Sequence, residues 1–480
     1  MKARIFTVLL LFCLLFTGVT GFAASGDADS SPDQYIPDDA YAQDRDENAP
    51  PDLTGAASAM LYNLDSDFLM HDYQGDAEIY PASTVKLMTA VTALDYLADR
   101  LDETVTVPAE VIRETAGVTM ELRTGERITI RQLFAGLLIA GANDAAYTLA
   151  LESCGSVEVF VARMNEKAKA IGMTNTAYVN VTGVDNVSAH TTGRDVLTLA
   201  VKAYDIDLIR ALTAEPTYEI PSTNEHSART LHTRNYLLSR QIYPYYYTPE
   251  ASGMNAGATT KGGNCLVAVE TIGNVRYLCV VMGAGERPGE YQGNPVTLTE
   301  NYLLAADLFK WGSKTFEYRT IVSPMYVYGE IAVELSGGND YVTAVPTGIV
   351  QIFLPKGSNT ADYARVESEL FVTELTAPVS EGTEVGVVTV YGMDGSVIGR
   401  SPLVTKSSIN LSQWRFIGAK ILEVVRTKAF IICLSIFLLL SFIGILITAR
   451  LRFVRARRIA LRALAEDEDT GGGRSVELRR

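Results

Sequence analysis

The fold of this chain is decided by Pro81–Thr89, which reads PASTVKLMT. Residues three apart lie on one face of a helix, so the hydroxyl of Ser83 and the amine of Lys86 are expected in the same cleft. A serine is a weak nucleophile until a neighbouring base takes its proton, and a desolvated lysine can be that base. The spacing therefore predicts a nucleophile and its general base. Taken alone, Ser-x-x-Lys also fits a capped surface helix.

The complete run is far more specific than Ser-x-x-Lys alone. It resembles the nucleophile helix of the D-alanyl-D-alanine carboxypeptidases, the low-molecular-mass penicillin-binding proteins. Other segments that resemble this family follow in its order along most of the chain: Ala57–Asp65, Gly125–Leu133, Leu137–Ala146, Gly172–Thr176, His190–Asp195, Thr233–Leu238 and Gly253–Gly257. The resemblance implies an α+β penicillin-recognising serine enzyme fold, in which an antiparallel sheet is flanked by helices and a helical lobe forms the other side of the cleft.

Two of the family's motifs differ in this chain. Where the family usually has Ser-x-Asn, Gly141–Asn143 reads Gly-Ala-Asn, and where it has Lys-Thr-Gly, Asn255–Gly257 reads Asn-Ala-Gly. In the family, the replaced serine and lysine are hydrogen-bonded neighbours that help to move protons and hold the terminal carboxylate of the substrate. Because both are replaced together, the pattern favours loss of a paired function over random decay.

The resemblance also assigns the site residues. They are Ser83, Lys86 and Asn143 for catalysis, and Asn255, Gly257, Ala258 and Arg234 for substrate binding. The oxyanion hole would use the backbone N–H groups of Ser83 and Ala258, which do not depend on the replaced side chains. Arg234 either binds the carboxylate with two parallel hydrogen bonds or is a solvated loop charge. Lys261 is expected at a hairpin turn, either within reach of the site or outside it.

The function implied by the resemblance is that of a membrane-anchored serine D,D-carboxypeptidase. It would act on peptidoglycan stem peptides through an acyl-enzyme on Ser83, with β-lactams as acylating analogues and no cofactor. General acid–base help is typically worth ~10²–10⁴-fold, so a chain without the motif serine and lysine could bind its ligand without turning it over. The alternative is a peptidoglycan-binding or scaffolding protein on the same fold. A β-lactamase is less favoured, because no deacylating glutamate is identified.

Composition excludes several other classes of function. A formal net charge of −15 argues against nucleic acid as a partner. The four histidines are scattered and the cysteines lack metal-ligand spacing, so no metal site is expected. Cys265 and Cys279 lie in apolar runs that are predicted to be neighbouring strands. We expect them to be packing residues, although a cross-strand disulfide is the alternative.

The 480 residues leave room for several segments. Lys2, Arg4 and the apolar run Ile5–Thr20 are typical of a signal peptide. Residues rich in Asp, Pro and Ser follow and predict disorder. From Ile321 the pattern changes to short alternating strands, with strands expected at Met325–Val333, Ile349–Leu354 and Val385–Tyr391. The expected segments are a signal peptide at 1–23, an acidic disordered linker at 24–51, a catalytic domain at 52–318, a small all-β domain at 319–408, an amphipathic juxtamembrane segment at 409–428, a transmembrane helix at 429–449 and a cytoplasmic tail at 450–480.

Ala429–Ala449 provides 21 residues without a charge. At ~1.5 Å of rise per residue, this is enough to cross a hydrocarbon core of ~30 Å. The residues that follow include Arg450, Arg452, Arg455, Arg457, Arg458 and Arg462. By the positive-inside rule these arginines stay in the cytoplasm, so we expect a single-pass protein of the cytoplasmic membrane with its domains outside the cell.

Overall fold

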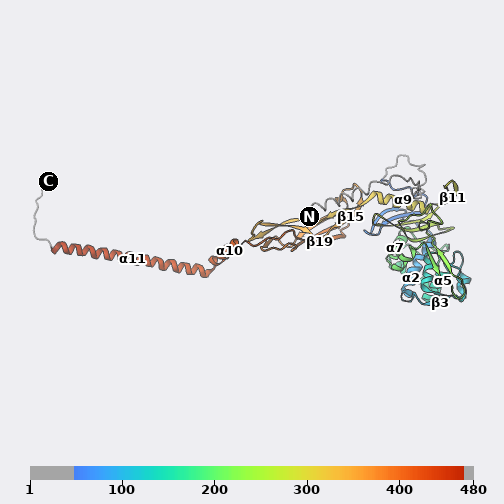
Figure 1. Ribbon diagram of the computed structural model, residues 1–480, viewed down its shortest axis with the longest axis horizontal. Coiled ribbons are helices and arrows are strands. Elements are labelled where there is room, and N and C mark those ends of the chain that lie inside the picture. The colour runs from blue at the N-terminus through green and yellow to red at the C-terminus, as the bar shows by residue number, and fades with distance from the viewer. Residues whose placement is uncertain (1–47, 470–480) are drawn as a thin grey trace, which may run out of the picture. The chain divides into compact units, whose positions relative to one another are not determined.

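The computed structural model describes residues 48–469, and the chain divides between Glu317 and Tyr318 into two compact units (Figure 1). The expected signal peptide at 1–23, the linker at 24–47 and the end of the tail at 470–480 lie outside the described residues. Asn48 falls in the predicted linker, yet its carbonyl accepts a hydrogen bond from Trp311 Nε1 at 2.9 Å. The described end of the linker therefore already contacts the first unit.

A five-stranded antiparallel sheet is the centre of the first unit, with the order β2-β1-β9-β8-β7. Its strands are β1 (Ser58–Asn63), β2 (Phe68–Tyr73), β7 (Ala251–Thr259), β8 (Gly263–Ile272) and β9 (Val275–Ala284). The apolar runs of β8 and β9 are almost fully buried, because both faces of these central strands are covered. Strand β7 lies at the edge of the sheet and faces the segment Ala82–Thr84.

The two faces of this sheet pack against different helices. Val267, Leu278 and Val280 belong to the core that the sheet shares with the helical lobe. On the other face, Leu61 lies against Gly312 of α9 (Glu300–Thr315), which runs along β8 and β9. The helical lobe and α9 are therefore on opposite faces of one sheet.

The helical lobe is built around α2, in which nearly every side chain is buried. Its helices are α2 (Val85–Leu97), α3 (Ala109–Glu114), α4 (Ile130–Leu138), α5 (Asn143–Cys154), α6 (Val157–Ala170), α7 (Gly193–Tyr204) and α8 (Asp207–Thr213). Helix α4 begins with a capping box, in which Thr129 and Gln132 satisfy each other's backbone N–H groups. An apolar helix such as α2 needs partners on all sides, and α4, α5, α6 and α7 surround it.

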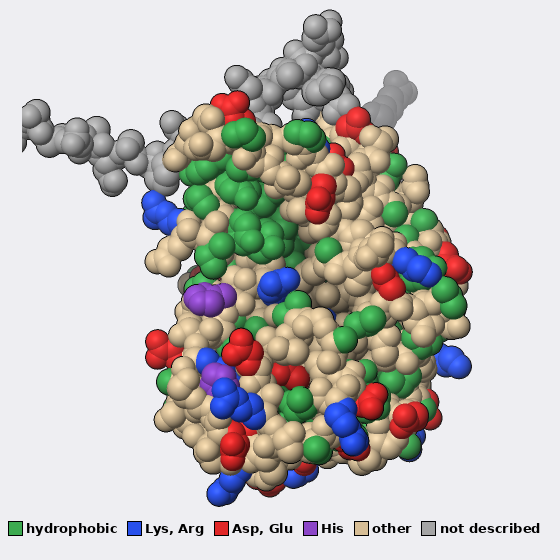
Figure 2. All heavy atoms as spheres, turned by 90° about the vertical axis from the view of Figure 1, so that its right-hand side faces the viewer, with side chains coloured by type: hydrophobic (Ala, Val, Ile, Leu, Met, Phe, Trp, Pro, Cys, Tyr) green, Lys and Arg blue, Asp and Glu red, His purple; other side chains and the backbone are tan. Residues whose placement is uncertain are grey.

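Short elements complete the first unit. They are the 3₁₀ turns η1 (Ala82–Thr84), η2 (Ala98–Arg100) and η3 (Tyr236–Leu238), and the hairpins β3 (Thr104–Thr106) with β4 (Arg127–Thr129), β5 (Thr217–Ile220) with β6 (Arg229–His232), and β10 (Glu286–Tyr291) with β11 (Asn294–Thr299). Figure 2 shows one face of the molecule, on which hydrophobic side chains gather in a hollowed area while acidic and basic side chains are interspersed elsewhere.

The cysteines predicted to be packing residues are free thiols. Cys265 and Cys279 are buried on β8 and β9, and Cys279 lies opposite Ala268 rather than opposite Cys265. The alternative of a cross-strand disulfide between them is therefore wrong.

The second unit contains an all-β domain. Its six-stranded sheet has the order β16-β18-β19-β14-β13-β17, and β12 pairs with β15. The strands are β12 (Phe316–Val322), β13 (Gly329–Glu334), β14 (Tyr341–Pro346), β15 (Val350–Pro355), β16 (Ala364–Leu370), β17 (Glu374–Thr376), β18 (Glu384–Gly392) and β19 (Val397–Thr405), with the 3₁₀ turn η4 (Thr360–Asp362) before β16. The strand predicted from Met325 begins only at Gly329. Pro324 interrupts the backbone there, and the N–H of Tyr326 closes a turn onto the carbonyl of Ser323 at 2.9 Å.

Two helices follow the all-β domain. Helix α10 (Gln413–Arg426) lies within the predicted amphipathic segment, and α11 extends from Lys428 to Asp469 (Figure 1). The stretch Lys428–Ala463 of α11 is long and apolar enough to cross a membrane. The mixed first unit, the all-β domain and the apolar C-terminal helix confirm the predicted fold class.

Candidate active site

Ser83 and Lys86 come together because they lie on consecutive turns at the start of one helix. Ser83 is in the 3₁₀ turn η1 and Lys86 is in the first turn of α2. Lys86 Nζ lies 3.4 Å from Ser83 Oγ. Ala82, directly before the serine, has a left-handed backbone with φ of 46°. Such a conformation is strained for a residue with a side chain, and strain of this kind concentrates at functional sites.

The environment of Lys86 makes its amine a usable base. The side chain is only 4% exposed, and its Nζ donates a hydrogen bond to the carbonyl of Thr182 at 2.7 Å. Burial, with a further contribution from the positive charge of Arg234, lowers the pKa of Lys86 to about 7. A large fraction of the amine is therefore neutral at neutral pH, and a neutral amine can accept the proton of a serine hydroxyl.

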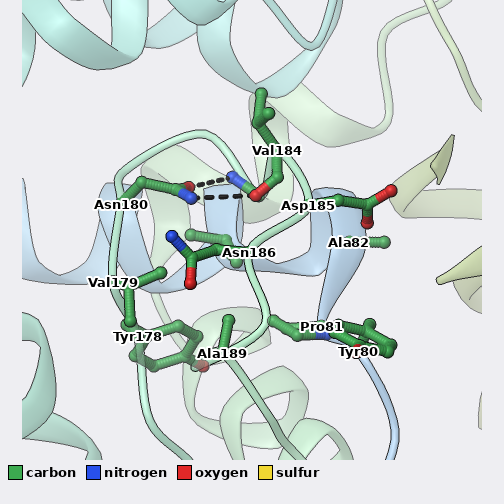
Figure 3. Close-up of a pocket in the computed structure, with 12 residues that line it drawn as sticks. Tyr80, Pro81, Ala82, Tyr178, Val179, Asn180, Val184, Asp185, Asn186 and Ala189 are labelled. Atoms are coloured by element: carbon green, nitrogen blue, oxygen red, sulfur yellow. Dashed lines mark hydrogen bonds between the residues drawn. The ribbon is translucent and has the colours of Figure 1, made fainter. Parts of the chain in front are cut away.

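The loop that carries Thr182 is held by Asn180. Asn180 Oδ1 accepts hydrogen bonds from the backbone N–H groups of Thr182 at 3.1 Å and Gly183 at 2.7 Å, and its Nδ2 donates to the carbonyl of Val184 at 2.9 Å. Figure 3 shows this loop beside Tyr80, Pro81 and Ala82, with the Asn180 amide directed into the loop. The carbonyl that receives the Lys86 ammonium is thus fixed by a side chain two residues earlier.

Strand β7 approaches the nucleophile so closely that it requires a glycine. A Cβ at Gly257 would lie 2.3 Å from Ser83 Oγ, which is far inside van der Waals contact. Gly257, its neighbour Ala258, Ser83 and Lys86 line a cavity of about 160 Å³. The cavity is therefore bounded by the edge strand on one side and by the start of α2 on another.

Asn143 also lines this cavity. Its Nδ2 donates to the carbonyl of Ala116 at 2.6 Å, and its backbone N–H donates to the carbonyl of Val118 at 2.7 Å. Asn143 Oδ1 is buried and accepts no hydrogen bond from the residues that the structure describes. An acceptor without a partner at the edge of a cavity is suited to a ligand N–H group.

Arg234 extends into the same cavity, beside Gly141. A Cβ on Gly141 would be 3.5 Å from Arg234 Cγ, and Gly141 has a φ of 65°. The backbone of Arg234 is fixed at both ends, since its N–H donates to the carbonyl of Ile139 at 3.1 Å and its carbonyl accepts from the hydroxyl of Tyr302 at 3.0 Å. Arg234 and Lys86 are the basic side chains that line this cavity in the described part of the chain, and Arg234 is the one that lies beside Gly141.

The remaining two predicted positions lie farther from the cavity surface. Asn255 is 4% exposed, and its Oδ1 accepts no hydrogen bond among the described residues. The cavity wall on β7 is formed by the residues after it, 256–259. Lys261 is at the β7–β8 turn as predicted, but its ammonium lies 5.4 Å from the ring centre of Tyr80 and does not line the cavity.

Sequence reasoning missed the loop that supports Lys86 and the backbone of Gly117 and Val118, which also line the cavity. A signal for the loop was present in Asn180-Val-Thr-Gly183, because asparagine followed by glycine within three residues is typical of a side-chain-stabilised turn. No residue in or next to this turn indicates from the sequence that the turn lies against Lys86.

The chain matches two known protein families along its length. The sequence model described as D-alanyl-D-alanine carboxypeptidase matches residues 45–286, and that of the penicillin-binding protein 5 C-terminal domain matches residues 316–410. The chain is 25% identical over 358 residues to the D-alanyl-D-alanine carboxypeptidase DacF of Bacillus subtilis, covering 74% of this chain and 86% of the relative. It is 31% identical over 266 residues to the D-alanyl-D-alanine carboxypeptidase DacB2 of Mycobacterium tuberculosis, covering 54% and 82%.

Among solved structures, penicillin binding protein 5 from Haemophilus influenzae is similar in fold. The TM-score is 0.52 at 24% sequence identity, and the match covers 75% of this chain and 99% of that structure. At this identity the likeness concerns the fold alone, and it extends over both the mixed unit and the all-β domain.

Proposed function

Because the chain belongs to the D-alanyl-D-alanine carboxypeptidase family, we propose that it is a membrane-anchored serine carboxypeptidase that removes the terminal D-alanine of peptidoglycan stem peptides. The observation that supports catalysis most directly is the buried amine of Lys86, 3.4 Å from Ser83 Oγ and with a pKa of about 7. A neutral lysine beside a serine hydroxyl has little use in a protein that only binds its ligand.

In the proposed reaction, Lys86 accepts the proton of Ser83 Oγ as the oxygen attacks the carbonyl carbon between the two D-alanines. The negative charge that develops on the carbonyl oxygen is stabilised by the backbone N–H groups of Ser83 and Ala258. The C–N bond then breaks, and the Lys86 ammonium returns the proton to the departing amine. A water molecule, deprotonated by Lys86, releases the acyl group from Ser83 in the second half of the reaction.

Substrate binding in this proposal uses the groups that line the cavity. Asn143 Oδ1, which has no hydrogen bond from the described residues, accepts an N–H group of the stem peptide. The guanidinium of Arg234 pairs with the terminal carboxylate in place of the motif lysine. Gly257 leaves the room that the nucleophile needs, and Asn255 is buried on the same strand.

One observation favours a second function, that of a peptidoglycan-binding protein with little turnover. Gly141 and Asn255 provide neither a hydroxyl nor an ammonium at the two positions where the family has serine and lysine. A proton could then move only through Lys86, and losing one buried partner of a charge pair typically costs about 2–5 kcal/mol. Slow acylation without release of D-alanine would correspond to this function.

We further propose that α11 anchors the protein with its two units outside the cell and its C-terminus in the cytoplasm. The apolar stretch is followed by six arginines within Arg450–Arg462, and cytoplasmic flanks of spanning helices are rich in such residues. This arrangement would hold the cavity on the side of the membrane where the cell wall lies.

The function is tested with the full chain, purified in detergent and incubated with a labelled penicillin. Mass spectrometry should find one adduct per chain on the peptide that contains Ser83, and none in Ser83→Ala. In parallel, a synthetic pentapeptide that ends in D-Ala-D-Ala should release D-alanine.

The two readouts separate the two functions. Adduct together with released D-alanine supports the carboxypeptidase, and adduct without release supports the binding protein. A folded chain that forms no adduct at high penicillin concentration would overturn the acyl-enzyme mechanism.

A further inference from the structure

A second and larger cavity lies on the other side of the first unit, on the sheet face that α9 covers. Its volume is about 380 Å³, against about 160 Å³ for the cavity at Ser83. Its walls come from α9, from the end of β8, and from the tyrosine-rich segment 245–247 that precedes β7. We propose that this cavity binds a primary ammonium group on a short aliphatic chain, held by the carboxyl group of Glu270 and by the surrounding tyrosine rings.

Glu270 is the reason for proposing a positively charged ligand. The residue is only 5% exposed, it lines the cavity, and no described residue gives its carboxyl group a hydrogen bond or an ion pair. A buried carboxyl group without a partner is costly, so such groups normally have one. Burial, with a contribution from nearby Glu250, raises the pKa of Glu270 to about 8. A cation in the cavity would supply the missing partner.

The tyrosine rings are the second feature of the cavity that suits an ammonium ligand. The rings of Tyr245 and Tyr246 are 4.6 Å apart between centres, and those of Tyr246 and Tyr302 are 4.8 Å apart, so the three form a continuous aromatic wall. The faces of aromatic rings attract cations, and their carbon surface packs against methylene groups. Each of these three side chains lines the cavity.

The other charged groups restrict the ligand further. Glu250 lies at the exposed side of the cavity, where it accepts a hydrogen bond from the hydroxyl of Thr248 at 2.7 Å. Arg287 and Lys310 also line the cavity and are exposed. Their positive charges disfavour a second cationic group at the opening, so a monoamine fits better than a polyamine. An ammonium has three donors, which suit the carboxylates of Glu270 and Glu250 together.

One hydrogen bond links a wall of this cavity to a residue of the cavity at Ser83. The hydroxyl of Tyr302 donates to the backbone carbonyl of Arg234 at 3.0 Å, and Leu237, three residues later, lines the larger cavity. Binding of an amine does not use Ser83, however. The proposal can therefore fail or succeed independently of the proposed acyl-enzyme.

The test is a titration of the full chain in detergent with n-butylammonium, followed by saturation-transfer NMR at pH 6, 7, 8 and 9. The ammonium stays protonated in this range, whereas Glu270 must lose its proton to form the ion pair. The Kd should fall about tenfold per pH unit up to pH 8 and then level off. Other charged or titratable groups also face the cavity and can affect the Kd: Glu250, Arg287, Asp307, Lys310, Tyr245, Tyr246, Tyr247 and Tyr302. Cys279 is a further titratable group close enough to be affected by the charge of Glu270.

Uncharged 1-butanol and anionic butyrate should bind at least tenfold more weakly than n-butylammonium at pH 8. Glu270→Gln keeps the size of the side chain, and should raise the Kd for the amine at least tenfold and remove its pH dependence. Glu219→Gln, on the exposed side of β5, is the matched control and should leave the titration unchanged.

Unchanged binding in Glu270→Gln, or tighter binding of butyrate than of the amine, would overturn the proposal. Ser83→Ala should bind the amine as the wild-type chain does. N-acetyl-L-lysine amide carries the same group on a peptide unit, so tighter binding of this probe would identify the ligand as a peptide-borne amine, and weaker binding would identify it as a free one.

Discussion

At the scale of single residues, the protonation of Lys86 sets the pH range in which the site can react. The amine is a base only when neutral, and its pKa of about 7 means that the neutral fraction grows as pH rises from 6 to 8. The rate of penicillin adduct formation should therefore rise with a midpoint near pH 7 and level off above pH 8. Stopped-flow fluorescence with a labelled penicillin measures this rate.

The same profile also identifies the base. A rate that does not depend on pH between 6 and 8, or one that rises only near pH 10 as for an ordinary lysine, would show that Lys86 does not take the proton. Lys86→Met should lower the rate by ~10²–10⁴-fold, which is the usual contribution of a general base.

Gly257 gives a second prediction at this scale. A methyl group there would meet Ser83 Oγ at 2.3 Å, so Gly257→Ala should displace the nucleophile and slow adduct formation at least ~100-fold. Gly338→Ala is the control, because no heavy atom lies within 4 Å of the added Cβ. Similar melting temperatures of the two variants, measured by circular dichroism, would show that the loss is local. Normal adduct formation in Gly257→Ala would contradict the described approach of β7.

The sequence predicted contacts between side chains correctly where the two residues are close together along the chain. Ser83 and Lys86 are three residues apart, and the periodicity of a helix brings them to one face. The acceptor of the Lys86 ammonium is 96 residues away in sequence, at Thr182. No local pattern encodes that contact, because it depends on how the helical lobe packs.

At the scale of elements, the loop 178–189 is predicted to control the reactivity of α2 through the position of the Thr182 carbonyl beside Lys86. Asn180→Ala removes the acceptor for two backbone N–H groups, and should cost about 1–3 kcal/mol of stability if these stay buried without partners. It should also slow adduct formation about tenfold or more, because the carbonyl of Thr182 loses its fixed position beside Lys86.

Asn186→Ala is the matched control in the same loop. Among the described residues, its Oδ1 accepts a hydrogen bond from the N–H of Ser188 alone, at 2.9 Å and in an exposed turn, so the rate should change little. Equal effects of the two substitutions on the rate would mean that the loop acts through general stability. Thermal unfolding of both variants supplies the comparison.

Element boundaries show where the sequence pattern is insufficient. The strand predicted from Met325 starts at Gly329, since a proline and a turn outweigh the β-branched and aromatic residues before it. Conversely, β8 and β9 follow the predicted apolar runs closely, because a central strand must be apolar on both faces. The larger cavity was not predicted, since its walls combine α9, β8 and a loop.

At the scale of the whole molecule, the prediction concerns membrane topology. External protease added to cells stripped of their wall should digest the region before Trp414 and spare an epitope placed after Arg480, because the proposed arrangement places the arginines and the C-terminus inside. Immunoblotting for the epitope follows the protected fragment. Cleavage of the epitope in intact cells, or release of the protein by high salt, would contradict the spanning arrangement.

Helix α11 runs without a break from Lys428 to Asp469, over 42 residues. At ~1.5 Å per residue such a helix is roughly 63 Å long, about twice the thickness of a hydrocarbon core. A rod without a joint does not absorb motion within itself, so a rotation or an axial push applied to one end is delivered to the other. In the proposed anchor, a rotation of the arginine-bearing half of α11 would therefore reach the bend at Thr427, between α10 and α11.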